Sequence, residues 1–198
     1  MDFKILADQY RNELLDNVLP FWLEHSQDLE FGGYFTCLDR KGGVFDTDKF
    51  IWLQGREVWM FSMLYNKVEK RQEWLDCAVQ GGEFLKKYGH DGNYNWYFSL
   101  DRSGRPLVEP YNIFSYTFAT MAFGQLSLAT GSQEYADIAK KTFEIILSKV
   151  DNPKGKWNKV HPGTRNLKNF ALPMILCNLA LEIEHLLDPG YLEQTMET

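Results

Sequence analysis

One motif occurs twice in this chain, at a spacing that constrains the fold. Residues 34–42 read YFTCLDRKG and residues 97–104 read YFSLDRSG, so both combine an apolar strand with an Asp-Arg-x-Gly turn. Such a strand before a glycine-containing turn predicts a β-hairpin. The first copy begins 63 residues before the second and ends 62 residues before it. A unit of about 62 residues therefore repeats, and 198 residues hold about three such units.

Helical periodicity fills the segments around these hairpins. Apolar residues recur at every third or fourth position, which is the pattern of amphipathic helices. We expect helices over residues 3–24, 51–67, 71–88, 111–129, 132–148 and 167–187. Pro20 should bend or restart the first of them. Gly131 should end one helix and Ser132 should cap the next. The repeating unit is thus a helix pair with a hairpin in the connection.

A unit of this length fits a ring better than a linear stack. Helix pairs in common solenoids have roughly 33 to 47 residues. We therefore expect an all-α fold, an (α/α) toroid whose inner helices line a central pocket, formed by residues 1–198 as a single domain. Stacked helix pairs leave an unpartnered face at each open end. Tyr191, Leu192 and Met196 resemble the start of a further helix, so we expect either a longer chain or a homodimer.

Charge and composition exclude several classes of protein. The net charge is −6 and no run of like charges occurs, which does not fit a nucleic-acid-binding protein. Apolar stretches fall far short of the roughly 20 residues that span a bilayer, and a charged N-terminus does not fit a signal peptide. We therefore expect a cytoplasmic protein. Cys37, Cys77 and Cys177 are widely spaced and should be buried apolar residues, and the histidines lack metal-ligand spacing.

The most specific stretch is WLQGREVWMFS, residues 52–62. Trp52, Arg56 and Trp59 lie at i, i+4 and i+7, so they share one helix face. If this face lines a pocket, Arg56 can donate hydrogen bonds to hydroxyls or to a developing oxyanion. Trp52 can then stack on a sugar ring. The alternative is that Arg56 pairs with Glu57 or with another carboxylate.

The next inner helix repeats this spacing with Tyr111, Ser115 and Phe118. The hydroxyls of Tyr111 and Ser115 would then reach the same pocket, although both residue types are also ordinary in the first turns of a helix. Aromatic residues make up 15% of the chain, which fits either a well-packed helical core or a carbohydrate pocket. Among the histidines, His161 is nearest to the expected rim of the pocket.

Several stretches together resemble the N-acylglucosamine 2-epimerase family, which includes the renin-binding proteins. They are residues 32–35, 52–62, 161–165 and 171–179, which occur in the order seen in the family. The resemblance implies the N-terminal half of an (α/α)6 barrel, because family members are about twice as long. It also implies that N-acetylglucosamine and N-acetylmannosamine are interconverted by removing the C2 proton and returning it to the opposite face.

The resemblance also assigns site residues. Arg56 matches an arginine of the first inner helix and is the expected catalytic residue, and Trp52, Tyr111 and Ser115 are expected to bind substrate. The family's two acid/base histidines match no residue here, so we expect the chain alone to be inactive. Residues 171–174 lack the histidine-bearing motif of relatives that act on disaccharides, which favours an N-acylhexosamine. No cofactor is expected, and ATP, which activates some members, is left open because no phosphate loop occurs.

Functions of different classes remain open at this point. The chain is either part of a sugar epimerase, including cellobiose 2-epimerases and aldose–ketose isomerases, or a non-catalytic helical module that binds a glycan or a protein. A glycan hydrolase would need two carboxylates about 5 to 10 Å apart in one pocket.

Overall fold

A computed structural model describes residues 2–110, 112–151, 161, 163, 170–190 and 193. Its helical segments are α1 (Phe3–Glu13), η1 (Leu14–Val18), α2 (Leu19–His25), α3 (Ile51–Lys67), α4 (Gln72–Tyr88), α5 (Phe114–Thr130), α6 (Gln133–Ser148), α7 (Ala171–Glu182) and η3 (Glu184–Leu186). Its strands are β1 (Cys37–Leu38), β2 (Val44–Asp46), β3 (Lys49–Phe50), β4 (Ser99–Leu100) and β5 (Pro106–Val108).

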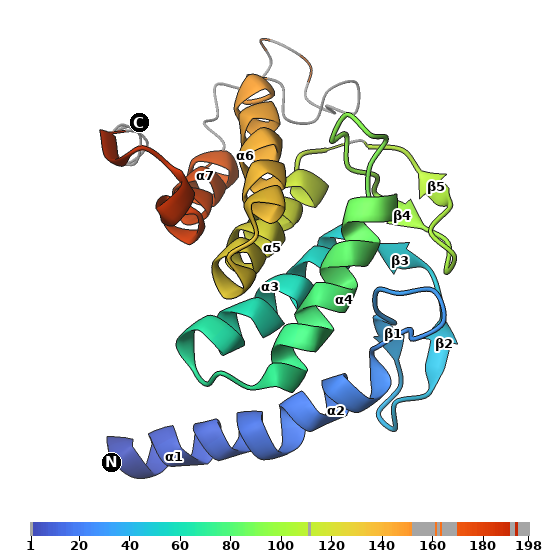
Figure 1. The fold of residues 1–198 in the computed structure, drawn as a ribbon, viewed down its shortest axis with the longest axis vertical. Coiled ribbons are helices and arrows are strands. Elements are labelled where there is room, and N and C mark those ends of the chain that lie inside the picture. The colour runs from blue at the N-terminus through green and yellow to red at the C-terminus, as the bar shows by residue number, and fades with distance from the viewer. Residues whose placement is uncertain are drawn as a thin grey trace.

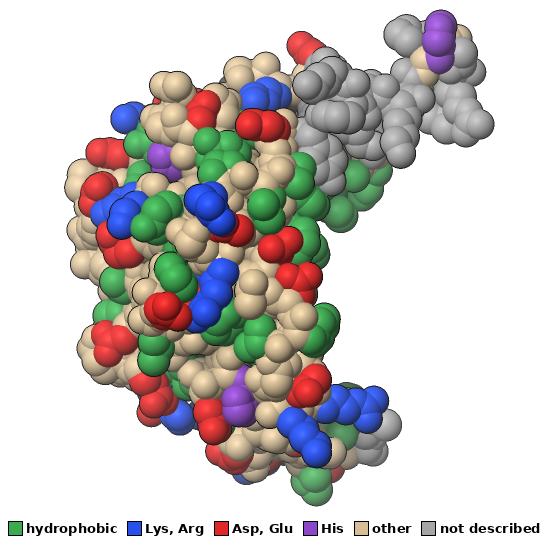
Figure 2. Space-filling view, turned by 90° about the vertical axis from the view of Figure 1, so that its right-hand side faces the viewer, with side chains coloured by type: hydrophobic (Ala, Val, Ile, Leu, Met, Phe, Trp, Pro, Cys, Tyr) green, Lys and Arg blue, Asp and Glu red, His purple; other side chains and the backbone are tan. Residues whose placement is uncertain are grey.

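Helices α3 to α7 form two layers that pack against each other and curve together (Figure 1). Helix α3 packs against α4 and α5, and α5 packs in turn against α6 and α7. Helices α3, α5 and α7 therefore form the inner layer, and α4 and α6 form the outer one. Figure 2 shows a hollowed edge along which hydrophobic and acidic side chains lie. The expected helical toroid with short hairpins is confirmed.

Helix ends differ from the expected ones where side chains bind the backbone. Helix α5 begins at Phe114 rather than at residue 111, because the Asn112 side chain accepts a hydrogen bond from the Phe114 backbone N–H at 2.9 Å. In contrast, Gly131 ends α5 in a left-handed conformation, with φ at +72°, and the Ser132 hydroxyl caps α6, as expected.

The first helix is irregular before Pro20 rather than at it. Residues 14–18 form a π-helical turn, in which the Leu19 backbone N–H donates to the carbonyl of Leu14. Pro20 has no N–H to donate to the carbonyl of Asp16, so a regular α-helix would lose one hydrogen bond here. The proline therefore acts on the preceding turn.

Both predicted hairpins are present and have the same turn. Strand β1 pairs with β2, and β4 pairs with β5, all antiparallel. In each turn an aspartate, Asp39 or Asp101, accepts hydrogen bonds from the backbone N–H groups two and four residues later. Gly42 and Gly104 follow with φ of +83° and +95°, a region that favours glycine. The short strand β3 also pairs with β4, which the sequence pattern did not indicate because β3 has two residues.

A buried ionic cluster connects the two hairpin regions. Asp28, in the loop after α2, accepts hydrogen bonds from Lys49 Nζ and from Arg102 Nε, both at 2.9 Å. Burial raises the pKa of Asp28, but the bonds from Arg102 and Lys49 outweigh that effect and bring it to about 2. Because Lys49 lies in β3 and α3 begins two residues later, this cluster positions the first turn of α3.

Apolar side chains are exposed at both ends of the described fold. In the first helix Phe3, Tyr10, Leu14 and Val18 are exposed, and in α7 Met174 and Leu181 are exposed. This matches the expectation that an incomplete ring leaves its end helices uncovered. The further helix expected around Tyr191, Leu192 and Met196 lies outside the described residues.

The cysteines differ in their burial. Cys77 is buried, but Cys37 and Cys177 are half-buried, so the prediction for the cysteines is right for one of them. Within the part of the chain that the structure describes, no helix has both the length and the apolar character to cross a membrane.

Candidate functional site

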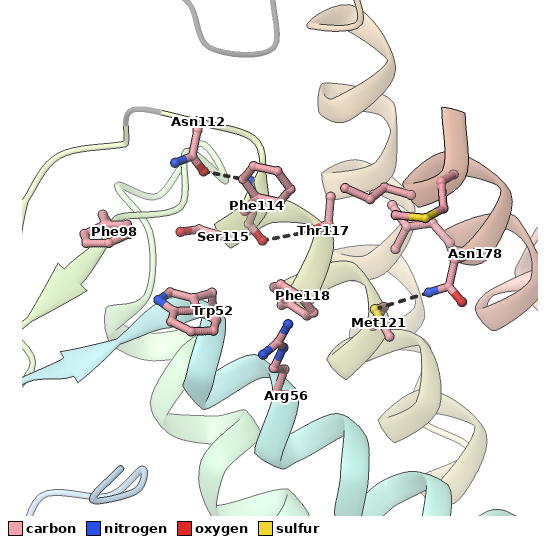
Figure 3. Close-up of a pocket in the computed structure, with 13 residues that line it drawn as sticks. Trp52, Arg56, Phe98, Asn112, Phe114, Ser115, Thr117, Phe118, Met121 and Asn178 are labelled. Carbon is pink, nitrogen blue, oxygen red and sulfur yellow. Dashed lines mark hydrogen bonds between the residues drawn. The ribbon is translucent and has the colours of Figure 1, made fainter. Parts of the chain in front are cut away.

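A cavity of about 690 Å³ opens between the inner helices. Helix α3 contributes Trp52 and Arg56, α5 contributes residues that include Ser115 and Phe118, and α7 contributes residues that include Asn178. Figure 3 shows the end of Arg56 beside the rings of Trp52 and Phe118, with Asn178 across the cavity. The pocket is therefore built by side chains from each of the repeating units.

Aromatic rings hold the guanidinium of Arg56. Its central carbon lies 4.9 Å from the ring centroid of Trp52 and 4.3 Å from that of Phe118. Cation–π contacts of this kind orient an arginine without using its N–H donors. Among the described residues Arg56 forms no ion pair. Its hydrogen-bond donors are therefore available to a ligand in the cavity.

The alternative pairing of Arg56 with Glu57 is wrong. Consecutive helical residues point in different directions, and Glu57 is buried in the protein while Arg56 is exposed. Burial raises the pKa of Glu57 to about 8, although a hydrogen bond with Ser26 opposes the rise. Glu57 is therefore a largely uncharged acid at neutral pH, which cannot neutralise a cation.

Gly55 explains how Phe118 comes to lie over Arg56. A Cβ atom at position 55 would lie 2.8 Å from the backbone oxygen of Phe118 and 3.1 Å from its Cβ. The absence of a side chain therefore lets α3 and α5 approach closely at this level. Phe118 occupies the i+7 position of the pattern that begins at Tyr111, as the repeat predicted.

The structure brings together part of the predicted site. Trp52, Arg56 and Ser115 all line the cavity, and Ser115 is buried in its wall. Tyr111 lies outside the described residues. Trp59 is not among the described lining residues, because its indole Nε1 donates to Glu182 Oε2 at 2.9 Å instead. The binding and catalytic roles of the predicted residues stay predictions.

Asn178 was missed by reasoning on the first two repeats. Its Nδ2 lies 3.8 Å from the sulfur of Met121, which places the amide at the edge of the cavity. A signal for it exists in the sequence, because Trp52, Ser115 and Asn178 follow one another at intervals of 63 residues. Extending the repeat into the third unit would have found it.

The polar groups of the cavity can donate hydrogen bonds to a hydroxyl-bearing ligand. Of the described residues that line it, Arg56 is the only one with an ionisable side chain, and the polar remainder are hydroxyls and amides, from Asn112, Ser115, Thr117 and Asn178. These groups can orient hydroxyls and stabilise an oxyanion. The described residues contain no group of three potential metal ligands, and His161 is exposed and not in the lining.

Comparisons with known proteins identify relatives. The sequence profile of the family described as N-acylglucosamine 2-epimerase (GlcNAc 2-epimerase) matches residues 33–198. The N-acylglucosamine 2-epimerases of Bos taurus and Homo sapiens are 42% and 40% identical over 174 residues, which is 85% of this chain and 41% of each relative. The cellobiose 2-epimerase of Dictyoglomus turgidum is 29% identical over 168 residues, covering 80% of this chain and 42% of that protein.

Solved structures are also similar. The cellobiose 2-epimerase of Spirochaeta thermophila matches with a TM-score of 0.81 at 20% identity, over 98% of this chain and 52% of that one. The fold is thus about half of an (α/α) barrel, as expected from the repeats. The chain spans about two fifths of the length of the curated relatives it matches.

Proposed function

Because this chain belongs to the N-acylglucosamine 2-epimerase family, we propose that its cavity binds an N-acylhexosamine and forms half of the site of a sugar 2-epimerase. The reaction interconverts N-acylglucosamine and N-acylmannosamine at C2. The observation that carries this proposal is the guanidinium of Arg56, which aromatic rings hold in the cavity with its donors unpaired among the described residues.

Each described wall of the cavity has a role in this reaction. Removal of the C2 proton from the open-chain sugar moves the C–H electron pair toward C1 and leaves negative charge on the C1 oxygen. Arg56 donates hydrogen bonds to that oxygen and so stabilises the enolate. The half-buried indole of Trp52 offers a face to the sugar, and the hydroxyl of Ser115 and the amide of Asn178 orient its polar groups.

The proton-transfer groups belong to a different part of the site in this proposal. Epimerisation needs two groups with pKa values near neutrality, one on each face of C2. No histidine or carboxylate stands among the described residues that line the cavity. We propose that the part of the longer relatives not covered by this chain supplies these groups, so that the chain alone binds sugar without epimerising it.

Identity to the relatives favours an N-acylhexosamine over cellobiose. Four N-acylglucosamine 2-epimerases are 40 to 42% identical to the chain, whereas four cellobiose 2-epimerases are 28 to 30% identical. A non-catalytic glycan-binding module is the second candidate, because the described lining holds no acid/base group. A hydrolase is disfavoured, since no carboxylate stands in that lining.

Saturation-transfer NMR with N-acetylmannosamine tests the binding step. We expect transfer to the sugar from the unsubstituted chain and loss of most of it from Arg56→Met. Arg40→Met is the matched control, because Arg40 is exposed in the first hairpin turn and is not among the residues that line the cavity. Cellobiose in place of N-acetylmannosamine tests the runner-up substrate. Equal transfer to N-acetylmannosamine from the unsubstituted chain, Arg56→Met and Arg40→Met would contradict the proposed pocket, and so would no transfer from the unsubstituted chain.

Proton exchange in D2O tests the division of the site. The C2 proton of N-acetylmannosamine is followed by NMR with the chain, with and without ATP. We expect the signal to persist in both cases. Loss of the signal would show that the chain completes an acid/base site by itself, and loss only with ATP would identify ATP as an activator.

We also propose that the chain by itself forms a homodimer in the cytoplasm. Exposed apolar side chains on its end helices support association, since either a second copy or the remainder of a longer protein would cover them. Sedimentation velocity should give the mass of two chains, and a monomer at micromolar concentration would refute the dimer. The cytoplasmic location rests on the sequence, and cell fractionation tests it.

A further inference from the structure

The carboxylate of Glu182 is shared by the inner helices. One oxygen, Oε2, accepts a hydrogen bond from Trp59 Nε1 at 2.9 Å and another from Gln125 Nε2 at 3.0 Å. Trp59 belongs to α3, Gln125 to α5, and Glu182 is the last residue of α7. A single carboxylate oxygen therefore connects α3, α5 and α7, the helices that form the cavity.

Gln125 is itself held in one orientation. Its amide oxygen accepts a hydrogen bond from Asn66 Nδ2 at 3.0 Å, and its Nε2 also lies 3.2 Å from the backbone carbonyl of Glu182. The side chain is 5% exposed, so its donor and acceptor groups are paired inside the protein. Connected polar groups of this kind orient one another more firmly than isolated pairs do. The amide is therefore a rigid donor to Glu182.

Packing strengthens this attachment at the next residue. A Cβ atom on Gly124 of α5 would lie 2.5 Å from Cγ2 of Ile183, which follows Glu182 and is fully buried. The glycine thus lets α5 approach the end of α7 closely. Hydrogen bonds and packing together attach the C-terminal end of α7 to the rest of the fold.

The same helix carries one wall of the cavity. Met174, Asn178 and Glu182 follow one another at intervals of four residues, so the three share a helix face. Asn178 and Met174 line the cavity from α7. The opposite wall is Arg56 of α3 with the rings of Trp52 and Phe118, which belong to α3 and α5. A movement of α7 would therefore shift the Asn178 wall and leave the Arg56 wall in place.

We propose that Glu182 is a positioning residue, which sets the distance between the Asn178 wall and the Arg56 wall of the sugar pocket by bonding to Trp59 and Gln125. This inference rests on the proposed function. It also gives Trp59, which the sequence pattern placed in the pocket, a role behind the pocket.

Binding of N-acetylmannosamine by Glu182 variants tests the proposal. Glu182→Gln should bind within about twofold of the unsubstituted chain, because an amide oxygen accepts the same two bonds. Glu182→Ala leaves both donors without their acceptor and should weaken binding about tenfold. Glu184→Ala is the matched control, since this exposed side chain has no hydrogen bond within the described residues. If Glu182→Gln loses as much affinity as Glu182→Ala, positioning through the shared oxygen is refuted.

A double-mutant cycle separates positioning from general stability. Trp59→Phe removes one donor and should weaken binding less than Glu182→Ala. The double variant should bind as weakly as Glu182→Ala alone, because both changes act through the same bond. Additive losses in affinity, or a fall in the free energy of unfolding with an unchanged Kd, would show a merely structural role.

A readout without ligand separates this proposal from the proposed function. The methyl group of Met121 and the side chain of Asn178 should show a nuclear Overhauser contact, which Glu182→Ala loses and Glu182→Gln keeps. If the unsubstituted chain binds no sugar but the contact depends on Glu182, the proposed function fails and positioning of α7 stands. If sugar binds and neither contact nor affinity depends on Glu182, the positioning proposal fails alone.

Discussion

Glu57 should make the stability of this fold depend on pH, and Glu57→Gln should remove that dependence. The side chain is 8% exposed, and its Oε1 atom has no hydrogen-bond partner among the described residues. Burial is the main cause that raises its pKa from 4.5 to about 8, and the hydrogen bond with Ser26 opposes it. The folded protein therefore holds a proton that the unfolded chain releases at lower pH.

The sign and size of the effect follow from this difference. Above pH 4.5 the unfolded state loses its proton while the folded state keeps it, so the folded state becomes less stable as the pH rises. The loss continues until the pH passes about 8, where both states are ionised. At 1.36 kcal/mol per pH unit, the interval corresponds to about 5 kcal/mol in total and about 3 kcal/mol by neutral pH.

Urea unfolding followed by circular dichroism at pH values from about 4 to 9 measures the effect. Glutamine has nearly the same shape as protonated glutamate and does not ionise, so Glu57→Gln should gain stability relative to the unsubstituted chain as the pH rises. Glu144→Gln, an exposed substitution on the outer helix α6, is the control and should leave the profile unchanged. A difference between Glu57→Gln and the unsubstituted chain that stays constant with pH would refute the reasoning.

Other substitutions test the packing that supports the site. Gly55→Ala should lower the free energy of unfolding by about 1 to 3 kcal/mol, because its Cβ would meet the Phe118 backbone; urea titration measures the loss, and saturation transfer should fall with it. Asp28→Asn should cost about 3 to 5 kcal/mol in the same titration, since it leaves the Lys49 ammonium buried without its counter-charge. Gly104→Ala should cost about 1 to 3 kcal/mol, because φ there is +95°, and an unchanged thermal midpoint would contradict this.

Local rules were sufficient for the positions of most helices and for the hairpin turns. The helix over residues 51–67 was predicted with the bounds that the structure shows, because its apolar spacing and its boundaries are both local. The aspartate and glycine of each hairpin turn likewise act on backbone groups a few residues away. The same spacing placed Trp52, Arg56 and Ser115 toward one cavity, since residues on one helix face stay together when helices pack around a centre.

Long-range contacts decided what the side chains of α3 do. Trp52 and Trp59 share a helix face, yet one lies in the cavity and the other bonds to Glu182, 123 residues later in the chain. Glu57 is next to Arg56 in sequence, yet its pKa is set mainly by burial against other elements.

The sequence by itself determined the repeat, the helix pairs, the hairpin turns and the helix face that carries Arg56, because hydrogen bonding and amphipathic spacing act over a few residues. The tertiary structure alone decided that Arg56 has no ion-pair partner among the described residues, that the pKa of Glu57 is raised, that Asp28 is buried with Lys49 and that α7 is attached through Glu182. Those properties depend on which distant groups exclude water from a side chain or donate to it. Such neighbours are set by the packing of whole helices, which no local pattern encodes.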